Sequence, residues 1–285
     1  MPAVSIGMPV YNGEKYLKNA VDALLSQSFT DFELIISDNA SSDQTEAICR
    51  QYAARDSRIK YIRQRENRGA SANFEFVLEE ARGEYFMWAA CDDTRSPDFI
   101  EVNFKFLSEN PEYVASTSPN GFEGWGVDSQ TLERFSLDGE VCERFLRFFD
   151  HCWASNAMFY SLARTTALRD CAIVGSSFIA WDWAVILCLA KQGRMNRCEA
   201  GWILFGTGGI SNSLNAFKAF RNRSIELLLP LYRVSMITIG LSKDFPARKR
   251  GTILLALGKV NLMAVRIQLM FVLHKYRALI RRVLS

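Results

Sequence analysis

Residues 4–11 read VSIGMPVY, and this run sets the first element of the chain. It is short, apolar and rich in strand-forming residues. It stops at Asn12 and Gly13, a pair typical of turns. We therefore expect the chain to begin with a β-strand that ends in a turn.

Strand and helix signals alternate over the next hundred residues. Apolar residues recur at helical spacing or in short strand-like runs, and turn-forming residues separate them. In chain order we expect a helix over 17–25, a strand over 32–37, a helix capped by Asp43 and running to about residue 54, a strand over 59–63, a helix over 71–81, a strand over 85–90, and a helix with Pro97 in its first turn. Successive βα units predict an α/β fold, a Rossmann-like, mostly parallel sheet flanked by helices.

Length and cysteine content bound the class of protein. The 285 residues are 49% hydrophobic, which suffices for one large α/β core and an appended segment. The seven cysteines are odd in number, form no CxxC pair and follow no signal peptide. We therefore expect buried, reduced thiols in a cytoplasmic protein.

Charge is distributed unevenly along the chain. Residues 215–285 hold 14 Lys and Arg against Glu226 and Asp244, whereas residues 1–214 hold 20 basic and 29 acidic residues. A basic segment that is also aliphatic favours an anionic membrane surface over nucleic acid, which would require aromatic stacking and polar readout. The composition shift near Asn215 predicts a catalytic domain over 1–214 and a basic, amphipathic helical extension over 215–285.

The apolar stretches of this extension are not expected to cross a membrane. A span needs about 20 mostly apolar residues. Residues 225–241 contain Pro230 and Arg233, and residues 253–273 contain two further basic residues. A location on the bilayer surface is the expectation that follows.

Basic residues of the tail recur four, seven or eleven positions apart, which returns them to nearly the same side of a helix. They are Arg248, Lys259, Arg266, Arg277 and Arg281. Such a stripe fits an interfacial anchor formed by residues 248–285. It fits equally well a helix packed on the catalytic domain with a solvated basic face, or a dimer helix.

Acidic residues follow two of the expected strands. Asp38 comes directly after the second strand, and the pair Asp92 and Asp93 follows the fourth. Ligands bind outside the carboxyl ends of strands in open α/β sheets, so these acids are candidate site residues. Taken alone, Asp38 fits an ordinary turn. The pair fits either a loop or a divalent cation, and ligands that are all oxygen suit Mg²⁺ or Mn²⁺.

Several stretches of the first half resemble a known family. They are VSIGMPVYN at 4–12, LLSQSF at 24–29, FELIISDNASSDQT at 32–45, NRGASAN at 67–73, and ARGEY at 81–85 ahead of the acid pair. Together they resemble the inverting family 2 glycosyltransferases, enzymes of GT-A fold that move a sugar from a nucleotide diphosphate onto an acceptor. The resemblance covers about residues 4–115.

Carried over by position, the resemblance implies a donor site. Its nucleotide-sugar-binding residues would be Pro9, Tyr11, Glu14, Asp38, Asn67, Asn73 and Asp92. Asp38 would accept a hydrogen bond from the base, which fits uracil and therefore a UDP-sugar. Asp93, with Asp92, would hold Mn²⁺ or Mg²⁺ between the phosphates, where the cation neutralises charge on the leaving diphosphate.

Two departures from the family pattern concern this metal. Many members carry an acid two residues before the pair, where this chain has Ala90. Many also place a metal-holding histidine near the end of the catalytic domain, where this chain reads GTGGIS at 206–211, and neither His151 nor His274 matches. We expect a metal-dependent enzyme whose third protein ligand is unassigned.

An inverting transfer also needs a base to take the proton of the acceptor hydroxyl. Asp182 lies between Trp181 and Trp183 in a segment that resembles the family's acidic residue, aromatic residue and glycine-terminated helix. The resemblance makes Asp182 this base, with a raised pKa between two indoles. The residues alone favour a cap for a helix starting near Trp183. The two tryptophans are the acceptor-contacting residues we expect.

These patterns predict a non-processive glycosyltransferase in bacterial cell-surface polysaccharide or glycoconjugate synthesis. Residues 1–115 would bind the nucleotide-sugar and residues 116–214 a glycan or lipid-linked acceptor, with the enzyme peripheral on the inner face of the membrane. A processive synthase is disfavoured because no QxxRW-type segment occurs. A catalytically silent nucleotide-binding scaffold remains an alternative. A sugar nucleotidyltransferase is a weaker one, because residues 12–15 are not the glycine-rich loop it requires.

Overall fold

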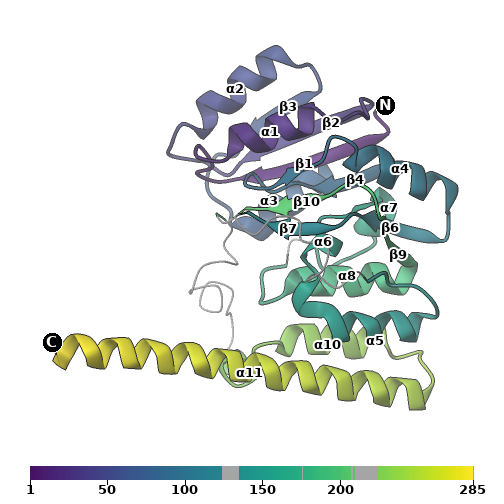
Figure 1. Cartoon of the computed structure of the whole chain (residues 1–285), viewed down its shortest axis with the longest axis vertical. Coiled ribbons are helices and arrows are strands. Elements are labelled where there is room, and N and C mark those ends of the chain that lie inside the picture. Colours follow the sequence, from purple (N-terminus) through teal and green to yellow (C-terminus); the bar gives the residue numbers. More distant parts are fainter. Residues whose placement is uncertain (124–134, 175, 207, 209–223, 285) are drawn as a thin grey trace.

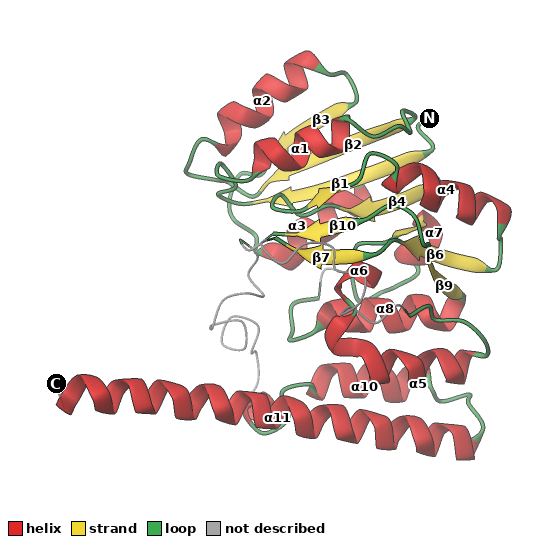
Figure 2. Ribbon diagram, viewed as in Figure 1, coloured by secondary structure: helices red, strands yellow, loops and turns green. Residues whose placement is uncertain are grey.

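The computed structural model describes residues 1–123, 135–174, 176–206, 208 and 224–284. A central sheet with helices on both faces makes up most of the molecule, and a long C-terminal helix runs along one side (Figures 1 and 2). The α/β architecture expected from the sequence is therefore confirmed. The expected boundary at Asn215 lies outside the described residues.

The central sheet has seven strands in the order β3-β2-β1-β4-β8-β6-β9. Its first half is parallel and consists of β1 (Val4–Val10), β2 (Phe32–Asp38), β3 (Ile59–Arg63) and β4 (Tyr85–Trp88). Its second half mixes directions. Strand β8 (Leu162–Arg164) runs antiparallel to β4 and to β6 (Tyr113–Thr117), and β9 (Arg194–Arg197) runs parallel to β6.

Helices cover both faces of this sheet. They are α1 (Leu17–Leu25), α2 (Thr45–Arg55), α3 (Ala70–Glu79), α4 (Phe99–Glu109), α5 (Val141–His151), α6 (Asn156–Phe159), α7 (Thr165–Arg169) and α8 (Trp181–Gln192), with a short 3₁₀ helix η1 (Cys152–Ala154). Successive side chains of a strand point to opposite faces. Leu34 and Ile36 of β2 accordingly belong to the apolar cluster that includes α1 and α4, whereas Ile35 belongs to the cluster on the other face, which includes α3 and α8.

A second, three-stranded sheet has the order β5-β10-β7, and the sequence patterns did not predict it. It consists of β5 (Thr94–Arg95), β7 (Asn120–Phe122) and β10 (Ile203–Phe205). Strands this short carry no readable periodicity. The sheet brings the chain at residue 206 back to the Asp92 and Asp93 pair.

Several expected boundaries shift in the structure. The helix expected to hold Pro97 in its first turn begins later, at Phe99, because the Phe99 N–H donates to the Ser96 carbonyl in a turn that precedes the helix. Helix α2 begins at Thr45, and the Asp43 carboxylate accepts the Thr45 N–H at 3.0 Å from two residues upstream. Strand β4 ends at Trp88, so a short turn separates it from the acid pair.

The C-terminal extension is helical, as expected. It consists of η3 (Ser224–Leu227), α10 (Tyr232–Leu241) and α11 (Ala247–Leu284). Ile253, Leu257 and Ala264 of α11 are buried in the same apolar cluster as α5 and α8, so this part of the extension belongs to the core. Beyond them α11 projects past the body of the molecule (Figure 1).

The expectation that no stretch is apolar enough to cross a membrane is wrong. Residues Ala247–Met270 form a helix that meets this criterion by length and composition alone. Lys259 and Arg266 do not prevent this, because an 18-residue window of the helix can hold two charges and stay predominantly apolar. Only 22% of that window is buried against the protein, so most of its surface faces outward.

The seven cysteines are all free. Four of them are buried, as expected: Cys49, Cys142, Cys152 and Cys171. The other three are partly exposed, because they lie where loops or helix edges meet the surface: Cys91, Cys188 and Cys198.

Candidate active site

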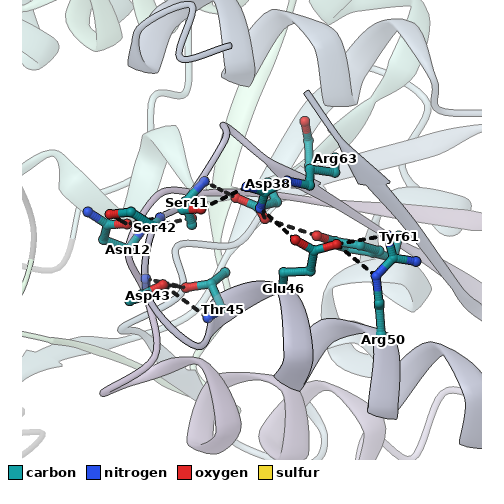
Figure 3. A network of polar contacts seen from close by, with 12 residues as sticks. Asn12, Asp38, Ser41, Ser42, Asp43, Thr45, Glu46, Arg50, Tyr61 and Arg63 are labelled. Carbon is teal, nitrogen blue, oxygen red and sulfur yellow. Dashed lines mark hydrogen bonds and ion pairs between the residues drawn. The ribbon is translucent and has the colours of Figure 1, made fainter. Parts of the chain in front are cut away.

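The loops after β1 and β2 form one polar rim at the carboxyl edge of the sheet (Figure 3). The Asn12 N–H donates to Ser41 Oγ at 2.8 Å, and the Ser42 N–H donates to Asn12 Oδ1 at 2.9 Å. Asn12 and Ala40 both adopt left-handed backbone angles, with φ of 51° and 59°. Left-handed non-glycine residues cost energy and occur where a site imposes them.

Asp38 lies fully buried beneath this rim. Its Oδ1 accepts the Ser41 N–H at 2.8 Å, and its Oδ2 accepts the Tyr61 hydroxyl at 2.9 Å and an Arg63 N–H at 2.7 Å. Arg63 also pairs with Glu46, which pairs with Arg50 on α2 (Figure 3). The protein therefore holds this carboxylate in one orientation at the end of β2.

The other residues expected at the base end lie around the same rim. Tyr11 is half exposed, and Pro9 stands beside Ser37 in the β1–β2 register. Glu14 Oε2 accepts the Gln44 N–H at 2.9 Å and so ties the first loop to the start of α2. The structure thus brings Pro9, Tyr11 and Glu14 to one edge with Asp38, and their nucleotide contacts remain predictions.

Two asparagines hold the loop that leads into α3. Asn73 is buried, donates to the Ser37 carbonyl at 2.9 Å and accepts the Ser37 hydroxyl at 2.6 Å. Asn67 is exposed, and its Oδ1 accepts N–H groups of Asn39 and Gly69, both at 2.9 Å. Both amides therefore have a structural role here, and the predicted contact with the donor stays a prediction.

The acid pair follows β4, next to the second sheet. Asp93 is 4% exposed, and its Oδ1 accepts the Gly206 N–H at 3.1 Å. Burial raises the pKa of Asp93 to about 7, the charge of Arg95 opposes this rise, and the charge of Asp92 adds to it. A side chain at Gly206 would place Cβ 2.2 Å from the Asp92 carbonyl oxygen, so only glycine fits against the pair.

The acid pair fits a divalent cation whose remaining ligands are supplied by the phosphates of a bound substrate. Asp93 Oδ2 is buried and has no hydrogen-bond partner within the described part of the chain. The described residues contain no group of three or more His, Cys, Asp or Glu placed to hold a metal. Magnesium is commonly held by one or two carboxylates together with substrate phosphates. Asp93 and Asp92 suit that arrangement, and most of the GTGGIS segment lies outside the described residues.

The site contains two further residues that the sequence did not predict. Arg95 is 3% exposed, donates to the Trp88 carbonyl at 3.1 Å and places its charge close enough to affect the pKa of Asp93. Tyr160 precedes β8, and the antiparallel pairing of β8 with β4 brings it beside the acid pair. Arg95 was visible as a lone base after the pair, whereas Tyr160 gave no local signal.

Asp182 lies in the first turn of α8 and is half-buried. Burial raises its pKa to about 6, and only its own N–H and that of Trp183 oppose the rise. The helix begins at Trp181, and Ala180, with a left-handed φ of 59°, is its N-cap residue. The capping role considered for Asp182 is therefore not observed. Burial and the charges of Asp93, Asp92 and Asp182 all raise the pKa of Tyr160, so Tyr160 is a neighbour of both the acid pair and this carboxylate.

Trp181 and Trp183 occupy the core beside Asp182. They are 9% and 7% exposed. Trp181 meets Phe74 of α3 edge-on, with ring centroids 5.4 Å apart, and Trp183 meets Trp153 edge-on at 5.0 Å. Their aromatic faces are largely used in packing, and an acceptor contact through them stays a prediction. The Phe74 contact links the donor half to the helix that carries Asp182.

Solved structures and curated relatives match this arrangement. *Staphylococcus aureus* TarS 1–349 in complex with UDP-GlcNAc superposes with a TM-score of 0.68 at 20% identity, covering 88% of this chain and 70% of that one. A mannosyltransferase from *Pyrobaculum calidifontis*, PcManGT with GDP-Man and Mn²⁺, gives 0.55 at 15% identity, covering 95% and 85%. The fold is therefore that of GT-A glycosyltransferases, as expected.

The sequence comparisons place the chain within that class. The model for glycosyl transferase family 2 matches residues 5–166. The *Bacillus subtilis* putative teichuronic acid biosynthesis glycosyltransferase TuaG is 33% identical over 80% of this chain and 90% of its own length. The putative glycosyltransferase EpsE of the same species is 38% identical over 44% of this chain, a match that spans 46% of EpsE. The chain belongs to glycosyl transferase family 2, which confirms the family and the enzyme class expected from the sequence.

Proposed function

We propose that this chain is an inverting, non-processive glycosyltransferase with Asp182 as its catalytic base. One observation carries the proposal: the Asp182 carboxylate, in the first turn of α8, has a pKa raised to about 6 and shares an electrostatic neighbour, Tyr160, with the Asp92 and Asp93 pair. A base near neutrality deprotonates the acceptor hydroxyl as that oxygen attacks the anomeric carbon. The proton moves to the Asp182 carboxylate, and the bond to the diphosphate breaks on the opposite side of the sugar.

The donor in this proposal is a UDP-sugar. Asp38 lies buried at the end of β2 under the rim formed by Asn12 and Ser41, so to accept the ring N–H of uracil it would have to give up one of its present donors. The UDP-GlcNAc in the TarS complex supports a uridine nucleotide at this edge. A divalent cation, Mn²⁺ or Mg²⁺, would be held by Asp93 and Asp92 and would neutralise the leaving diphosphate. The Mn²⁺ in the PcManGT complex supports this choice.

The acceptor in this proposal is a glycan or a lipid-linked glycan of bacterial cell-surface polysaccharide synthesis. The similarity to TuaG, a putative teichuronic acid biosynthesis glycosyltransferase, supports it. We place the enzyme in the cytoplasm, on the inner face of the membrane, with residues 248–285 against anionic lipid and with no role for nucleic acid. Leu255, Lys259, Leu262 and Arg266 are exposed along one side of α11, an interfacial pattern of apolar and basic residues.

Calorimetric titration of the full chain with UDP, GDP, dTDP and CMP tests the donor site. We expect UDP to bind in the presence of Mn²⁺ and to bind at least tenfold more weakly in EDTA or in Asp93→Asn. Asp98→Asn, five residues along the chain and partly exposed, is the matched control and should bind as the wild type does. Preference for another nucleotide would contradict the UDP assignment. Absence of any nucleotide binding would favour the silent scaffold.

Vesicle flotation tests the membrane surface. Truncation before α10 is unsuitable, because Ile253 and Leu257 belong to the core. Lys259→Glu with Arg266→Glu changes only exposed residues. Since each basic residue near an anionic surface contributes about 1 kcal/mol, the pair should lower binding to phosphatidylglycerol vesicles by more than tenfold. Unchanged binding would contradict the proposed surface.

A further inference from the structure

A groove of about 490 Å³ runs between α10 and the first half of α11. Its walls are almost entirely apolar and include Leu229, Tyr232, Ile239, Leu254, Leu262 and Val265. The polar side chains Ser235 and Asn261 also line it, and they are hydrogen-bonded to each other at 3.0 Å. The groove therefore offers a ligand an apolar wall, and the polar side chains Ser235 and Asn261 already bond to each other.

The groove continues onto an exposed apolar surface. Leu229, Leu254 and Leu262 line it and are also exposed, with 42%, 37% and 55% of their surface accessible. Leu255 and Met263, next to them on α11, are exposed as well. Exposed apolar surface of this extent, with basic residues among it, marks an interaction site. The continuity means that an apolar chain can enter the groove sideways from that surface.

The charged residues of the two helices that form the groove, α10 and α11, have one sign. Arg250, Lys259 and Arg266 stand on α11 within one helical turn of groove-lining residues. Neither α10 nor α11 contains an acidic residue. Cations beside an apolar slot complement a molecule that has a hydrocarbon chain and an anionic head.

We propose that this groove holds one acyl chain of an anionic phospholipid, with the phosphate of its headgroup beside Lys259 and Arg266. The proposal deepens the membrane association proposed above and rests on it. Adsorption of α11 to a membrane requires only an exposed apolar side of the helix. Binding of a single acyl chain also requires the empty groove between α10 and α11. The two can be separated by filling the groove without removing any apolar or basic side chain.

Gly258 provides that change. It lines the groove, and a Cβ built on it meets no atom within 4 Å. Gly258→Phe should therefore fill the groove without a clash at Cβ. Gly251→Phe is the matched control, because Gly251 lies on the same helix, has the same open surroundings and does not line the groove. Both changes replace a helical glycine with a better helix former and add the same side chain.

The full-length proteins are incubated with phosphatidylglycerol vesicles or with phosphatidylcholine vesicles, and retained lipid is counted by native mass spectrometry. We expect one phosphatidylglycerol per chain for wild type and Gly251→Phe, at least tenfold less for Gly258→Phe, and little phosphatidylcholine for any of them. Circular dichroism checks that both variants keep their helices.

Three results would overturn the proposal. Equal lipid retention by Gly258→Phe and Gly251→Phe would leave only adsorption through the exposed apolar surface. Loss of lipid binding by all three proteins, while UDP still binds, would remove the membrane association but not the transferase. A wild-type dimer that Gly258→Phe alone converts to a monomer, measured by light scattering, would make the occupant a second copy of this chain.

Discussion

The carboxylates of the site lie in two regions with contrasting surroundings. Asp38, under the β1–β2 rim, accepts three hydrogen bonds, one of them from the Arg63 guanidinium. Asp93 and Asp182, near Tyr160, are held by one to two backbone N–H groups each, and burial raises their pKa values to about 7 and about 6. The first region stabilises its charge with several protein donors, whereas the second compensates its charge only in part, through Arg95 and a few backbone N–H groups.

This difference suits the two groups of carboxylates to different roles. A carboxylate that already accepts several hydrogen bonds fixes the geometry of a binding surface. A buried carboxylate with few donors favours a cation or a proton, and these are what metal binding and base catalysis require. Removing a charge should therefore lower stability in the Asp38 region and lower activity in the Tyr160 region.

Asp182→Asn should give the largest effect. Without the base, kcat should fall by about 10²- to 10⁴-fold, measured as UDP released from the donor identified by titration, in the presence of acceptor. The affinity for UDP with Mn²⁺ should not change, because Asp182 lies on α8 and not on the nucleotide rim. A kcat within threefold of wild type would remove Asp182 from the mechanism.

Asp38→Asn should lower stability, in contrast to Asp182→Asn, which should lower kcat. The amide keeps one acceptor oxygen but turns an NH₂ toward Arg63 and Tyr61 or toward the Ser41 N–H, which should cost about 2 kcal/mol of unfolding free energy in urea titration. Asp31→Asn, exposed at the other end of β2, is the control and should cost less than about 0.5 kcal/mol. Equal stabilities for the two variants would break the contrast between the regions.

Gly206→Ala tests how closely the acid pair must be held. The added Cβ would lie 2.2 Å from the Asp92 carbonyl oxygen, so the backbone of one segment has to move. Overpacking of this kind costs about 1–3 kcal/mol, and we expect roughly tenfold weaker binding of UDP with Mn²⁺ in calorimetry. Gly251→Ala, whose Cβ meets open space, should leave binding unchanged.

The pH dependence should follow Asp182. Its folded pKa is raised from 3.8 to about 6, so below pH 6 the base is protonated, and kcat at saturating donor and metal should fall tenfold per pH unit. The same shift stabilises the protonated folded chain, and this stability is lost as the pH rises through about 6. Asp182→Asn should therefore be at least as stable as wild type at pH 8. A flat rate profile between pH 5 and pH 8 would contradict the assignment.

The sequence predicted the elements whose signals are local. Strands β1, β2 and β4 are largely apolar runs that end close to turn-forming residues, and Asp38 and the acid pair follow from where those runs stop. Tyr160 and Gly206 reach the site through the pairing of distant segments. Tyr160 depends on the antiparallel β8, and Gly206 depends on a second sheet whose strands have two or three residues. No window of sequence contains those contacts.

The left-handed backbone at Ala180 has a consequence for the accuracy of the site. The chain enters α8 through a conformation that an alanine adopts only at a cost of about 1–3 kcal/mol, two residues before Asp182. A glycine at position 180 would take the same bend more easily, but it would also allow others. Alanine at position 180 therefore lowers the stability of the fold, but it restricts the directions in which the Asp182 carboxylate can point.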